Sequence, residues 1–412
     1  MAFSLSDYAP IVGKAAISQL QQLSDDIAGI RIVHVNSTRM GGGVAEILAW
    51  MIPLMKELGI DASWEVLEGN DEFFAVTKKM HNGLQGQPVE LSSTEQKCYE
   101  RTNESNMSRL GEKLESADAV FIHDPQPAFL IKSAPNRKGK WIWRCHIDVS
   151  RPERKVWRFL KETIDQYSAS IFSIAQFAQP LRHPQVVIAP SIDPLSNKNC
   201  ELPASEIENV YQRFSINPLI PVLAQISRFD KFKDPVGVIN AYRILRKVMP
   251  VQLILAGGFA SDDPEGLEVL NQVREAAGND PDIHVLLLPG DQDRLINALQ
   301  RIADIIIQKS TKEGFGLTVT EGMWKGKPVI GGDTGGIQLQ VFNYNTGFLV
   351  KSPEGAALRI RYLLHNREIA KEMGMRAREN VRENFLLNRH LREYLTLLRW
   401  LKSGNNSKSL VA

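Results

Sequence analysis

Short apolar runs of strand length alternate along most of the chain with longer segments in which apolar residues recur at helical spacing. Strands and helices in this order form βαβ units, and βαβ units build parallel sheets. We therefore predict an α/β protein. The predicted strands are residues 30–36, 62–67, 170–174, 186–189, 222–226, 253–256, 285–288, 305–308 and 329–330, with two more that begin at residues 119 and 141. The predicted helices are 11–23, 44–58, 71–84, 94–114, 152–167, 235–248, 264–277, 291–302 and 317–324. Past residue 353 the chain is predicted to be helical, with leucines at helical spacing over 385–401.

One segment interrupts this pattern. Residues 190–197 are rich in proline and polar turn formers, and they separate two runs of strands and helices that are each long enough for a core. We predict two doubly wound, Rossmann-like domains that face each other across a cleft, with a boundary between residues 192 and 193. The first domain is 1–192, the second is 193–384, and a C-terminal helix within 385–412 crosses back to the first domain.

Composition excludes several classes of function. The 412 residues carry a net charge of +2 and are 23% charged, which argues against a nucleic-acid partner. No apolar run reaches membrane-spanning length, and the N-terminus has neither the basic flank nor the apolar core of a signal peptide. We expect a cytoplasmic protein with no membrane partner. Its three cysteines, Cys98, Cys145 and Cys200, suit neither a disulfide framework nor a zinc site.

Two carboxylates bracket a glycine-containing turn at 313–321. The apolar run before it is a predicted strand and a predicted helix begins at Leu317, so the motif lies at a helix N-terminus, which favours phosphate. Glu321 lies one turn into the helix, where its carboxylate can accept two hydroxyl hydrogen bonds, as from a ribose. Glu313 lies in the loop. Taken alone, the motif fits a ligand site and a purely structural role about equally well; in the structural role, Glu313 is a solvated loop charge and Glu321 a favourable acid in the first turn of the helix.

Other candidate residues follow predicted strands. Because ligands of open α/β sheets bind beyond the carboxyl ends of strands, such residues are expected to converge on one cleft. A structural role for each of them stays open, as does a simple tight turn at the glycines and an ordinary surface position for the two cations. The candidates are the glycine loop 41–43, which could approach a diphosphate, the polar residues Asn36, His123, Asp124, His146 and Asp148, the cations Arg228 and Lys233, which could neutralise a diphosphate, and the glycine-rich turn 331–336.

These features together resemble glycosyltransferase family four, a family of retaining enzymes with GT-B architecture, from about residue 32 to about residue 385. Within that family, several phrases look like the trehalose glycosyltransferring synthases. The phrases are His-Val-Asn-Ser-Thr at 34–38, Gly-Gly-Gly-Val-Ala-Glu at 41–46, His-Asp-Pro-Gln-Pro at 123–127, Trp-Arg-Cys-His-Ile-Asp at 143–148, Pro-Ser-Ile-Asp-Pro-Leu at 190–195 and Glu-Gly-Phe-Gly-Leu-Thr-Val-Thr-Glu at 313–321.

The resemblance implies a role for each domain and for individual residues. The first domain would bind the acceptor and the second the nucleotide sugar. Arg228 and Lys233 would hold the diphosphate, Glu321 the ribose, and Glu313 would lie near the transferred glucose, while His146 would contact sugar hydroxyls. The resemblance further assigns catalysis to Glu313, His146, Arg228 and Lys233, donor binding to Gly42, Gly43, Gly316, Leu317 and Thr318 besides Arg228, Lys233 and Glu321, and acceptor binding to Asn36, His123, Asp124 and Asp148.

The chain departs from the family pattern in one segment. Gln338 stands where many members carry an acid, and Asn343-Tyr344-Asn345 replaces the usual Asp-Gly turn. These departures bear on the details of the donor site and on the preference for a nucleotide base.

The resemblance implies transfer of glucose, with retention, from UDP- or ADP-glucose to free glucose, which gives α,α-trehalose. We expect same-face attack, in which the departing phosphate oxygen takes the acceptor proton; Glu313 and Asp148 are candidates for the nucleophile of a covalent alternative. No cofactor is required, and no residue pattern implies a site for Mg²⁺. The direction of reaction and a homodimeric state stay open. The alternatives are a trehalose phosphorylase, a transferase with another acceptor, a nucleotide-sugar isomerase and a sensor without catalytic activity.

Overall fold

The computed structural model describes residues 3–39, 42–258, 266–290 and 292–403. Contacts between Cα atoms divide the chain into two compact units. One unit comprises Met1–Pro190 together with Leu387–Ala412, and the other comprises Ser191–Leu386. The sequence prediction put the corresponding boundaries after residues 192 and 384.

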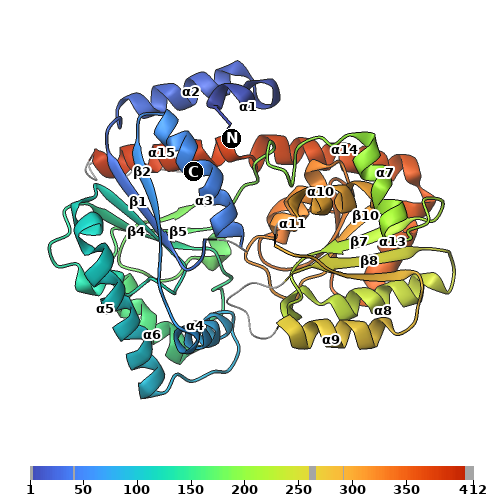
Figure 1. Cartoon of the computed structure of the whole chain (residues 1–412), viewed down its shortest axis with the longest axis horizontal. Coiled ribbons are helices and arrows are strands. Elements are labelled where there is room, and N and C mark those ends of the chain that lie inside the picture. Colours follow the sequence, from blue (N-terminus) through green and yellow to red (C-terminus); the bar gives the residue numbers. More distant parts are fainter. Residues whose placement is uncertain (1–2, 40–41, 259–265, 291, 404–412) are drawn as a thin grey trace. The chain divides into compact units, whose positions relative to one another are not determined.

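The first unit is built on a parallel sheet of six strands in the order β2-β1-β3-β4-β5-β6 (Figure 1). The central strands β1, β3 and β4 are buried along most of their length, because helices cover both faces of a sheet of this kind. This confirms the predicted sheet. The strands are β1 (Arg31–Asn36), β2 (Asp61–Val66), β3 (Ala119–His123), β4 (Lys140–Cys145), β5 (Ala169–Phe172) and β6 (Gln185–Val187).

The helices of this unit include the last helix of the chain, α15 (Leu387–Lys402), which packs against α2 (Lys14–Asp25) and α3 (Gly43–Glu57). This confirms that the C-terminal helix crosses back to the first unit. The helix predicted over 11–23 is wrong in its extent, because Gly13 has a φ of +86° and separates two helices. The remaining helices are α1 (Leu5–Val12), α4 (Asp71–Leu84), α5 (Ser93–Ser116) and α6 (Arg154–Ile164).

The second unit also has a parallel six-stranded sheet, in the order β12-β11-β10-β7-β8-β9. Strand β12, at the edge, was missed by the sequence prediction because its four residues lack a longer apolar run. The strands are β7 (Val222–Ile226), β8 (Gln252–Gly257), β9 (Ile283–Leu287), β10 (Ile305–Gln308), β11 (Val329–Gly332) and β12 (Gly347–Val350).

Helices of the second unit follow its strands as predicted, and the sequence prediction missed two of them, α7 and the short α12. Residues 264, 265 and 291, at the starts of two predicted helices, lie outside the described residues. The helices are α7 (Ala204–Arg213), α8 (Pro235–Arg246), α9 (Gly266–Ala277), α10 (Asp293–Ile302), α11 (Leu317–Trp324), α12 (Ile337–Gln340), α13 (Pro353–His365) and α14 (Arg367–Asn384).

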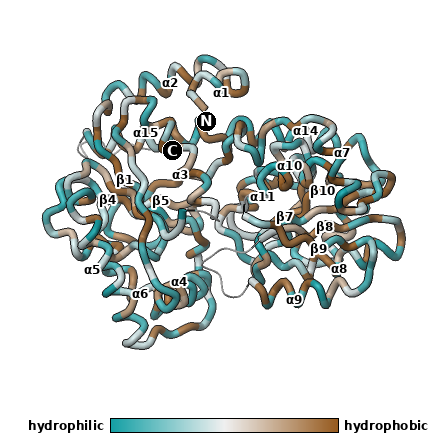
Figure 2. The backbone as a smooth tube through the Cα atoms, in the orientation of Figure 1, coloured by the Kyte–Doolittle hydropathy of each residue, from teal (hydrophilic) through white to brown (hydrophobic). Residues whose placement is uncertain are grey.

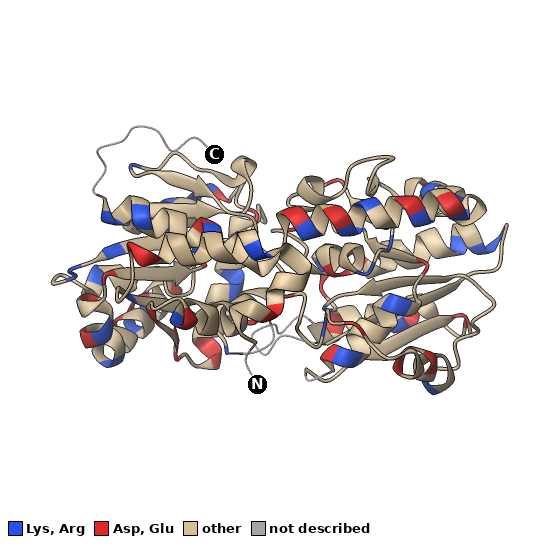
Figure 3. Ribbon diagram, turned by 90° about the horizontal axis from the view of Figure 1, so that it is seen from above, with Lys and Arg blue, Asp and Glu red and all other residues tan. Residues whose placement is uncertain are grey.

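Each unit has its own apolar core between sheet and helices. Trp141, Trp143 and Phe172 lie in the first core, and Leu253 and Phe348 lie in the second. Figure 2 shows hydrophobic segments along β7 and β8, while the surrounding helices alternate between hydrophobic and hydrophilic positions. Acidic and basic residues are interspersed along the helices in Figure 3, in keeping with a net charge of +2. Among the described residues, no helix combines the length and the apolar character that crossing a membrane requires.

Candidate active site

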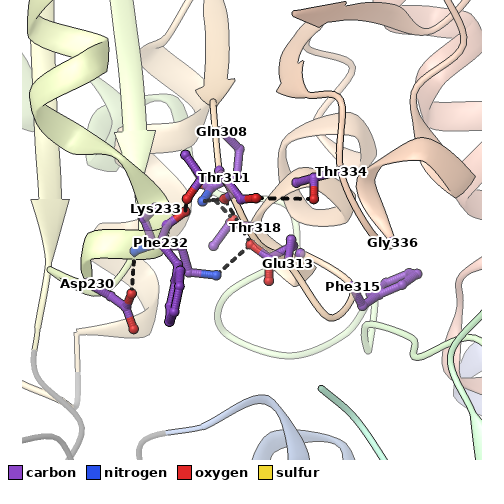
Figure 4. Close-up of polar contacts among 12 residues, drawn as sticks. Asp230, Phe232, Lys233, Gln308, Thr311, Glu313, Phe315, Thr318, Thr334 and Gly336 are labelled. Atoms are coloured by element: carbon purple, nitrogen blue, oxygen red, sulfur yellow. Dashed lines mark hydrogen bonds and ion pairs between the residues drawn. The ribbon is translucent and has the colours of Figure 1, made fainter. Parts of the chain in front are cut away.

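The carboxylate motif lies where β10 gives way to α11. Gly316 caps the helix with a φ of +88°, a backbone conformation that glycine adopts without strain. Glu313 is 8% exposed, and its Oε2 accepts hydrogen bonds from Lys233 Nζ at 2.5 Å and from Ser310 Oγ at 3.1 Å (Figure 4). Both bonds that described residues make to this carboxylate go to Oε2. Oε1 is therefore the oxygen that can accept a hydrogen bond from a ligand.

A series of hydrogen bonds fixes the position of this carboxylate. Thr318, in the first turn of α11, donates from Oγ1 to Gln308 Oε1 at 3.2 Å, and Gln308 Nε2 donates to Ser310 Oγ at 3.0 Å. Ser310 then donates to Glu313. The series joins the end of β10 to the start of α11, where Leu317 and Thr318 supply N–H groups that have no partner within the helix. The helix start, Lys233 and Glu313 thus form one polar site.

Glu321 lies inside α11 and is 3% exposed. Its Oε2 accepts a hydrogen bond from Gln300 Nε2 at 2.8 Å, and Lys198 Nζ lies 4.0 Å from its Oε1. Gln300 belongs to α10 and is fully buried, so it holds the carboxylate in one orientation. Oε1 is the carboxylate oxygen on the side of Lys198, and ribose binding by Glu321 stays a prediction.

The two predicted cations, Arg228 and Lys233, lie beyond the carboxyl end of β7, and Lys309 lies beyond that of β10. Arg228 is exposed two residues after β7, and Lys233 ends the short turn that follows. Lys309, which is buried directly after β10, forms an ion pair with the partly exposed Asp234. Asp234 Oδ1 in turn caps α8 by accepting from the backbone N–H of Gly237 at 3.1 Å. The structure thus brings Lys233 to Glu313 and leaves Arg228 at the surface of the same edge.

The segment that departs from the family pattern is ordered by its own side chains. Gln338 Nε2 donates to Asp333 Oδ1 at 2.6 Å, and this bond together with nearby Lys351 lowers the pKa of the Asp333 carboxyl. Tyr344 has a φ of +66°, and its hydroxyl accepts a hydrogen bond from Arg359 at 3.0 Å. Gln338 therefore pairs with an acid of the preceding turn, and Asn343-Tyr344-Asn345 supplies the left-handed residue that a glycine would otherwise provide.

In the first unit, the predicted polar residues do lie at strand ends. Asp124 follows β3 with a φ of +65°, and its Oδ1 accepts from the backbone N–H of His146 at 2.7 Å. Asp148 is 4% exposed, and its Oδ1 accepts from the N–H and the hydroxyl of Ser150 at 2.9 and 2.5 Å. Both carboxylates hold the segment after β4 in place. That they also bind an acceptor stays a prediction.

Asn36 is the last residue of β1, and the glycine loop follows this strand. Asn36 donates to the carbonyl of Thr38 at 2.7 Å and accepts from Trp64 Nε1 at 2.8 Å, so its amide holds the loop. Gly42 caps α3, which begins at Gly43, and a Cβ at Gly42 would have no described atom within 4 Å. The third glycine, Gly41, lies outside the described residues.

Three histidines form a hydrogen-bonded series across the sheet of this unit. His34 Nδ1 lies 3.0 Å from His123 Nε2, and His123 Nδ1 lies 2.9 Å from His146 Nε2. His34 and His123 are buried, and His146 is partly exposed. Burial lowers the pKa of His34 to about 3, and burial together with neighbouring positive groups lowers the pKa of His123 and of His146 well below 6.5. All three are therefore neutral at neutral pH.

Several residues of these sites were not predicted from the sequence. They are His34, Ser310, Lys309 and Gln300. His34, Lys309 and Gln300 contact residues that are distant in sequence, and Ser310 contacts Glu313 because of the loop that follows β10. The signals available for His34 were its strand, which ends two residues later at the predicted Asn36, and its place in the phrase His-Val-Asn-Ser-Thr at 34–38. Within the described ranges, no group of three or more His, Cys, Asp or Glu side chains could hold a metal ion.

Comparisons with known proteins bear on both units. The family model "Trehalose synthase, N-terminal domain" matches residues 34–179, and "Glycosyl transferases group 1" matches residues 209–380. A trehalose synthase of Pyrococcus horikoshii is 45% identical over 399 residues, which cover 96% of this chain and 95% of that protein. One of Rubrobacter xylanophilus is 41% identical over 401 residues and covers 96% of both chains.

More distant relatives agree in fold. A trehalose phosphorylase of Grifola frondosa is 29% identical over 86% of this chain, and the match spans 55% of that longer protein. Among solved structures, a trehalose-6-phosphate synthase superposes with a TM-score of 0.74 at 13% identity, covering 90% of this chain and 99% of that one. A sucrose-phosphate synthase from Thermosynechococcus elongatus gives 0.69 at 15% identity, covering 91% and 100%. These neighbours show the GT-B fold.

Proposed function

Because the chain belongs to the trehalose synthase family, we propose that it transfers glucose, with retention, from a nucleoside diphosphate glucose to free glucose and so makes α,α-trehalose. The observation that carries this proposal is the near full-length identity of 45% to a trehalose synthase. The phosphorylase relative is more distant at 29% identity and matches over about half its length. The chain is accordingly a glycosyltransferase of GT-B fold.

The polar site of the second unit supports binding of a diphosphate donor. Backbone N–H groups at the start of α11 and the ammonium group of Lys233 can bind the diphosphate, and the helix dipole favours its negative charge. Exposed Arg228, at the same edge of the sheet, can add a bidentate contact on binding. Glu321, held by Gln300, can accept two hydrogen bonds from the ribose hydroxyls.

The same groups support departure of the diphosphate. Negative charge grows on the leaving phosphate oxygens as the glycosidic bond breaks, and fixed cations and N–H groups stabilise that charge. We propose that the reaction does not require a metal ion, because these groups can stabilise the diphosphate themselves. We propose that the acceptor hydroxyl attacks from the face that the phosphate leaves, and that the phosphate oxygen takes its proton. Glu313 Oε1 would bind a hydroxyl of the transferred glucose.

The polar residues of the first unit complete the proposal. His146 is partly exposed and would donate a hydrogen bond to a sugar hydroxyl. Asn36, His123, Asp124 and Asp148 form hydrogen bonds within the protein. Their effect on the acceptor would then come mainly from the positions they give to the loops after β1, β3 and β4. A homodimer in solution stays part of the proposal, and light scattering tests it.

The direct test is a panel of donors. Purified protein is incubated with glucose and, separately, with UDP-glucose, ADP-glucose and glucose 1-phosphate, while released nucleotide or phosphate and disaccharide are measured. We expect trehalose with UDP-glucose or ADP-glucose, together with an equal amount of nucleoside diphosphate. Trehalose from glucose 1-phosphate alone would identify a phosphorylase instead. Disaccharide other than trehalose would identify another acceptor, and donor binding without any product would indicate a sensor.

A further inference from the structure

The histidine series has a simple origin in the register of the sheet. Strands β1, β3 and β4 are neighbours, with His34 paired to Phe121 and His123 paired to Arg144. His123 lies two residues after Phe121, and His146 lies two residues after Arg144. Since side chains two residues apart along a strand share a face, each histidine is the diagonal neighbour of the one before it. The three rings thus step across one face of the sheet toward its carboxyl edge.

The rings are packed so that they keep this arrangement. His34 stacks on Phe121 with ring centroids 4.7 Å apart and an angle of 8° between the planes. The centroids of His34 and His123, and those of His123 and His146, are 5.3 Å apart in each case. Tyr394 of α15 lies over His34 and Phe121. The series is therefore held by the sheet below it and by α15 above it.

Neutral histidines in such a series cannot choose their tautomers independently. A neutral imidazole has one N–H donor and one acceptor nitrogen, so each hydrogen bond fixes the donor of the next ring. Two arrangements satisfy both bonds. In one, every ring carries its proton on Nδ1 and the series donates from His34 toward His146. In the other, every ring carries its proton on Nε2 and the series donates from His146 toward His34.

The two ends of the series differ in environment. Nε2 of His34 is buried and has no hydrogen-bond partner among the described residues. At the other end, His146 is partly exposed. The second arrangement would leave an N–H buried without an acceptor at His34, and orphaned N–H groups are rare in protein interiors. The first arrangement instead places its terminal N–H on Nδ1 of His146, where solvent or a ligand can accept it.

We propose that His34 and His123 are positioning residues, which fix His146 as a neutral Nδ1–H tautomer and so make it a hydrogen-bond donor to a substrate oxygen. His146 in this state cannot remove a proton from the acceptor through Nδ1. Recognition of the sugar by His146 rests on the proposed function. The tautomer itself is a property of the free protein and does not depend on that function.

The neighbours of the series include one buried cation, Arg144, which affects whether the histidines are charged but does not select their tautomers. Arg144 is buried and lies near His123 and His146, and its positive charge disfavours protonation of both. His390 of α15 lies near His146 and is itself neutral, because burial holds its pKa well below 6.5. Asp124 contributes through its bond to the backbone N–H of His146. Loss of either hydrogen bond in the series would therefore allow His146 to populate both neutral tautomers, while the ring would stay uncharged.

The test is ¹⁵N NMR of the full-length protein labelled at its eight histidines. Protonated and bare ring nitrogens have well-separated ¹⁵N shifts, so the tautomer of each ring can be read at neutral pH. We expect His146, assigned by its loss in His146→Phe, to carry its proton on Nδ1. A proton on Nε2, an even mixture of tautomers or a cationic ring in the unsubstituted protein would overturn the proposal.

Two substitutions at His34 separate positioning from packing. His34→Phe keeps an aromatic ring and removes the donor, whereas His34→Asn places an amide where Nδ1 lies and can still donate to His123. We expect mixed tautomers of His146 in His34→Phe and the original tautomer in His34→Asn. His183→Phe is the control, because His183 bonds to Ser170 outside the series. An unchanged His146 tautomer in folded His34→Phe would contradict the proposal, and should that variant not fold, the measurement on the unsubstituted protein decides alone.

Activity tests the last step separately. In the donor assay we expect kcat/KM to fall about 3- to 10-fold in His34→Phe, because His146 then donates one hydrogen bond to the substrate less effectively. We expect kcat/KM to recover in His34→Asn. Correct tautomers without any transferase activity would overturn the proposed function and leave the positioning role intact. Normal transferase activity with the other tautomer would leave the proposed function intact and overturn the positioning role.

Discussion

Lys233 Nζ donates to Glu313 Oε2 across 2.5 Å, although the two residues lie 80 positions apart in the chain. They meet because β7 and β10 are neighbours in the sheet, and each residue follows one of these strands. Their side chains are 17% and 9% exposed. An ion pair this far from solvent contributes little net stability, because both charges lose hydration. Its position at the start of α11 fits a site for an anion, where a diphosphate would share the ammonium group with Glu313.

Replacing Lys233 tests this relationship. We expect Lys233→Ala to lower kcat about 100- to 1000-fold, as loss of a donor that stabilises developing negative charge does. Lys231→Ala is the matched control, since Lys231 lies in the same short turn and is exposed. Steady-state kinetics with a nucleoside diphosphate glucose measure both. Equal activities of the two variants would remove Lys233 from the donor site.

Replacing Glu321 tests the ribose contact. We expect Glu321→Ala to raise the donor KM about 10- to 100-fold, because hydrogen bonds to a charged acceptor are lost. Glu368→Ala, an exposed glutamate of α14, should leave the donor KM unchanged. The KM is measured with saturating glucose. A donor KM in Glu321→Ala that equals that of the control would instead fit a phosphorylase, whose donor has no ribose.

Gly316→Ala tests the helix start. A side chain at a φ of +88° costs about 1–2 kcal/mol, and its Cβ would lie 3.3 Å from Cγ of Glu313. We expect a lower unfolding temperature of the second unit by calorimetry, together with reduced kcat. Gly355→Ala is the control, because the nearest atom to its Cβ is 3.7 Å away and its φ is ordinary. If Gly316→Ala unfolds like Gly355→Ala, the backbone conformation at Gly316 differs from the one described.

The buried histidines make the first unit sensitive to acid. Burial lowers the pKa of His34 to about 3 and those of His123, His146 and His390 well below 6.5. Unfolding exposes these rings, which then bind protons below pH 6.5, so the stability present above that pH is lost as the pH falls. Each histidine contributes a slope of about 1.4 kcal/mol per pH unit below 6.5.

Tryptophan fluorescence in denaturant measures this slope, since Trp50, Trp64, Trp141, Trp143, Trp157 and Trp400 lie in the first unit and Trp324 in the second. We expect the free energy of unfolding to drop between pH 7.5 and pH 5. In His34→Phe, the slope of this free energy against pH should be smaller by about 1.4 kcal/mol per pH unit, the contribution of one proton. A stability of the first unit that stays constant over this range would contradict the neutral, buried series.

The local parts of the site could be predicted from the sequence. A β-branched run followed by glycines and a helical pattern places Glu313, Gly316 and Glu321 at the end of β10 and along α11 without knowledge of any other strand. Asp124 and His146 were likewise placed at strand ends by the apolar runs before them.

The contacts between distant segments could not be predicted. The bond from Lys233 to Glu313 depends on β7 lying beside β10, and the histidine series depends on the order β1-β3-β4 and its register. The hydrophobic period of a segment predicts that it is a strand, but it does not predict which strands lie beside it in the sheet. The contact between Gln300 and Glu321 was not predicted for a similar reason, because an amide in an amphipathic helix does not indicate which residue of another helix it will contact.

The most direct measurement follows a label through the reaction. Purified protein is given ¹³C-labelled glucose as acceptor and an unlabelled nucleoside diphosphate glucose as donor, and the product is examined by NMR and mass spectrometry. The account predicts one non-reducing disaccharide, α,α-trehalose, with one labelled and one unlabelled ring, formed in equal amount to the nucleoside diphosphate and nearly absent with Lys233→Ala. A product without the labelled ring, or a disaccharide that appears only when glucose 1-phosphate replaces the nucleotide sugar, would contradict it.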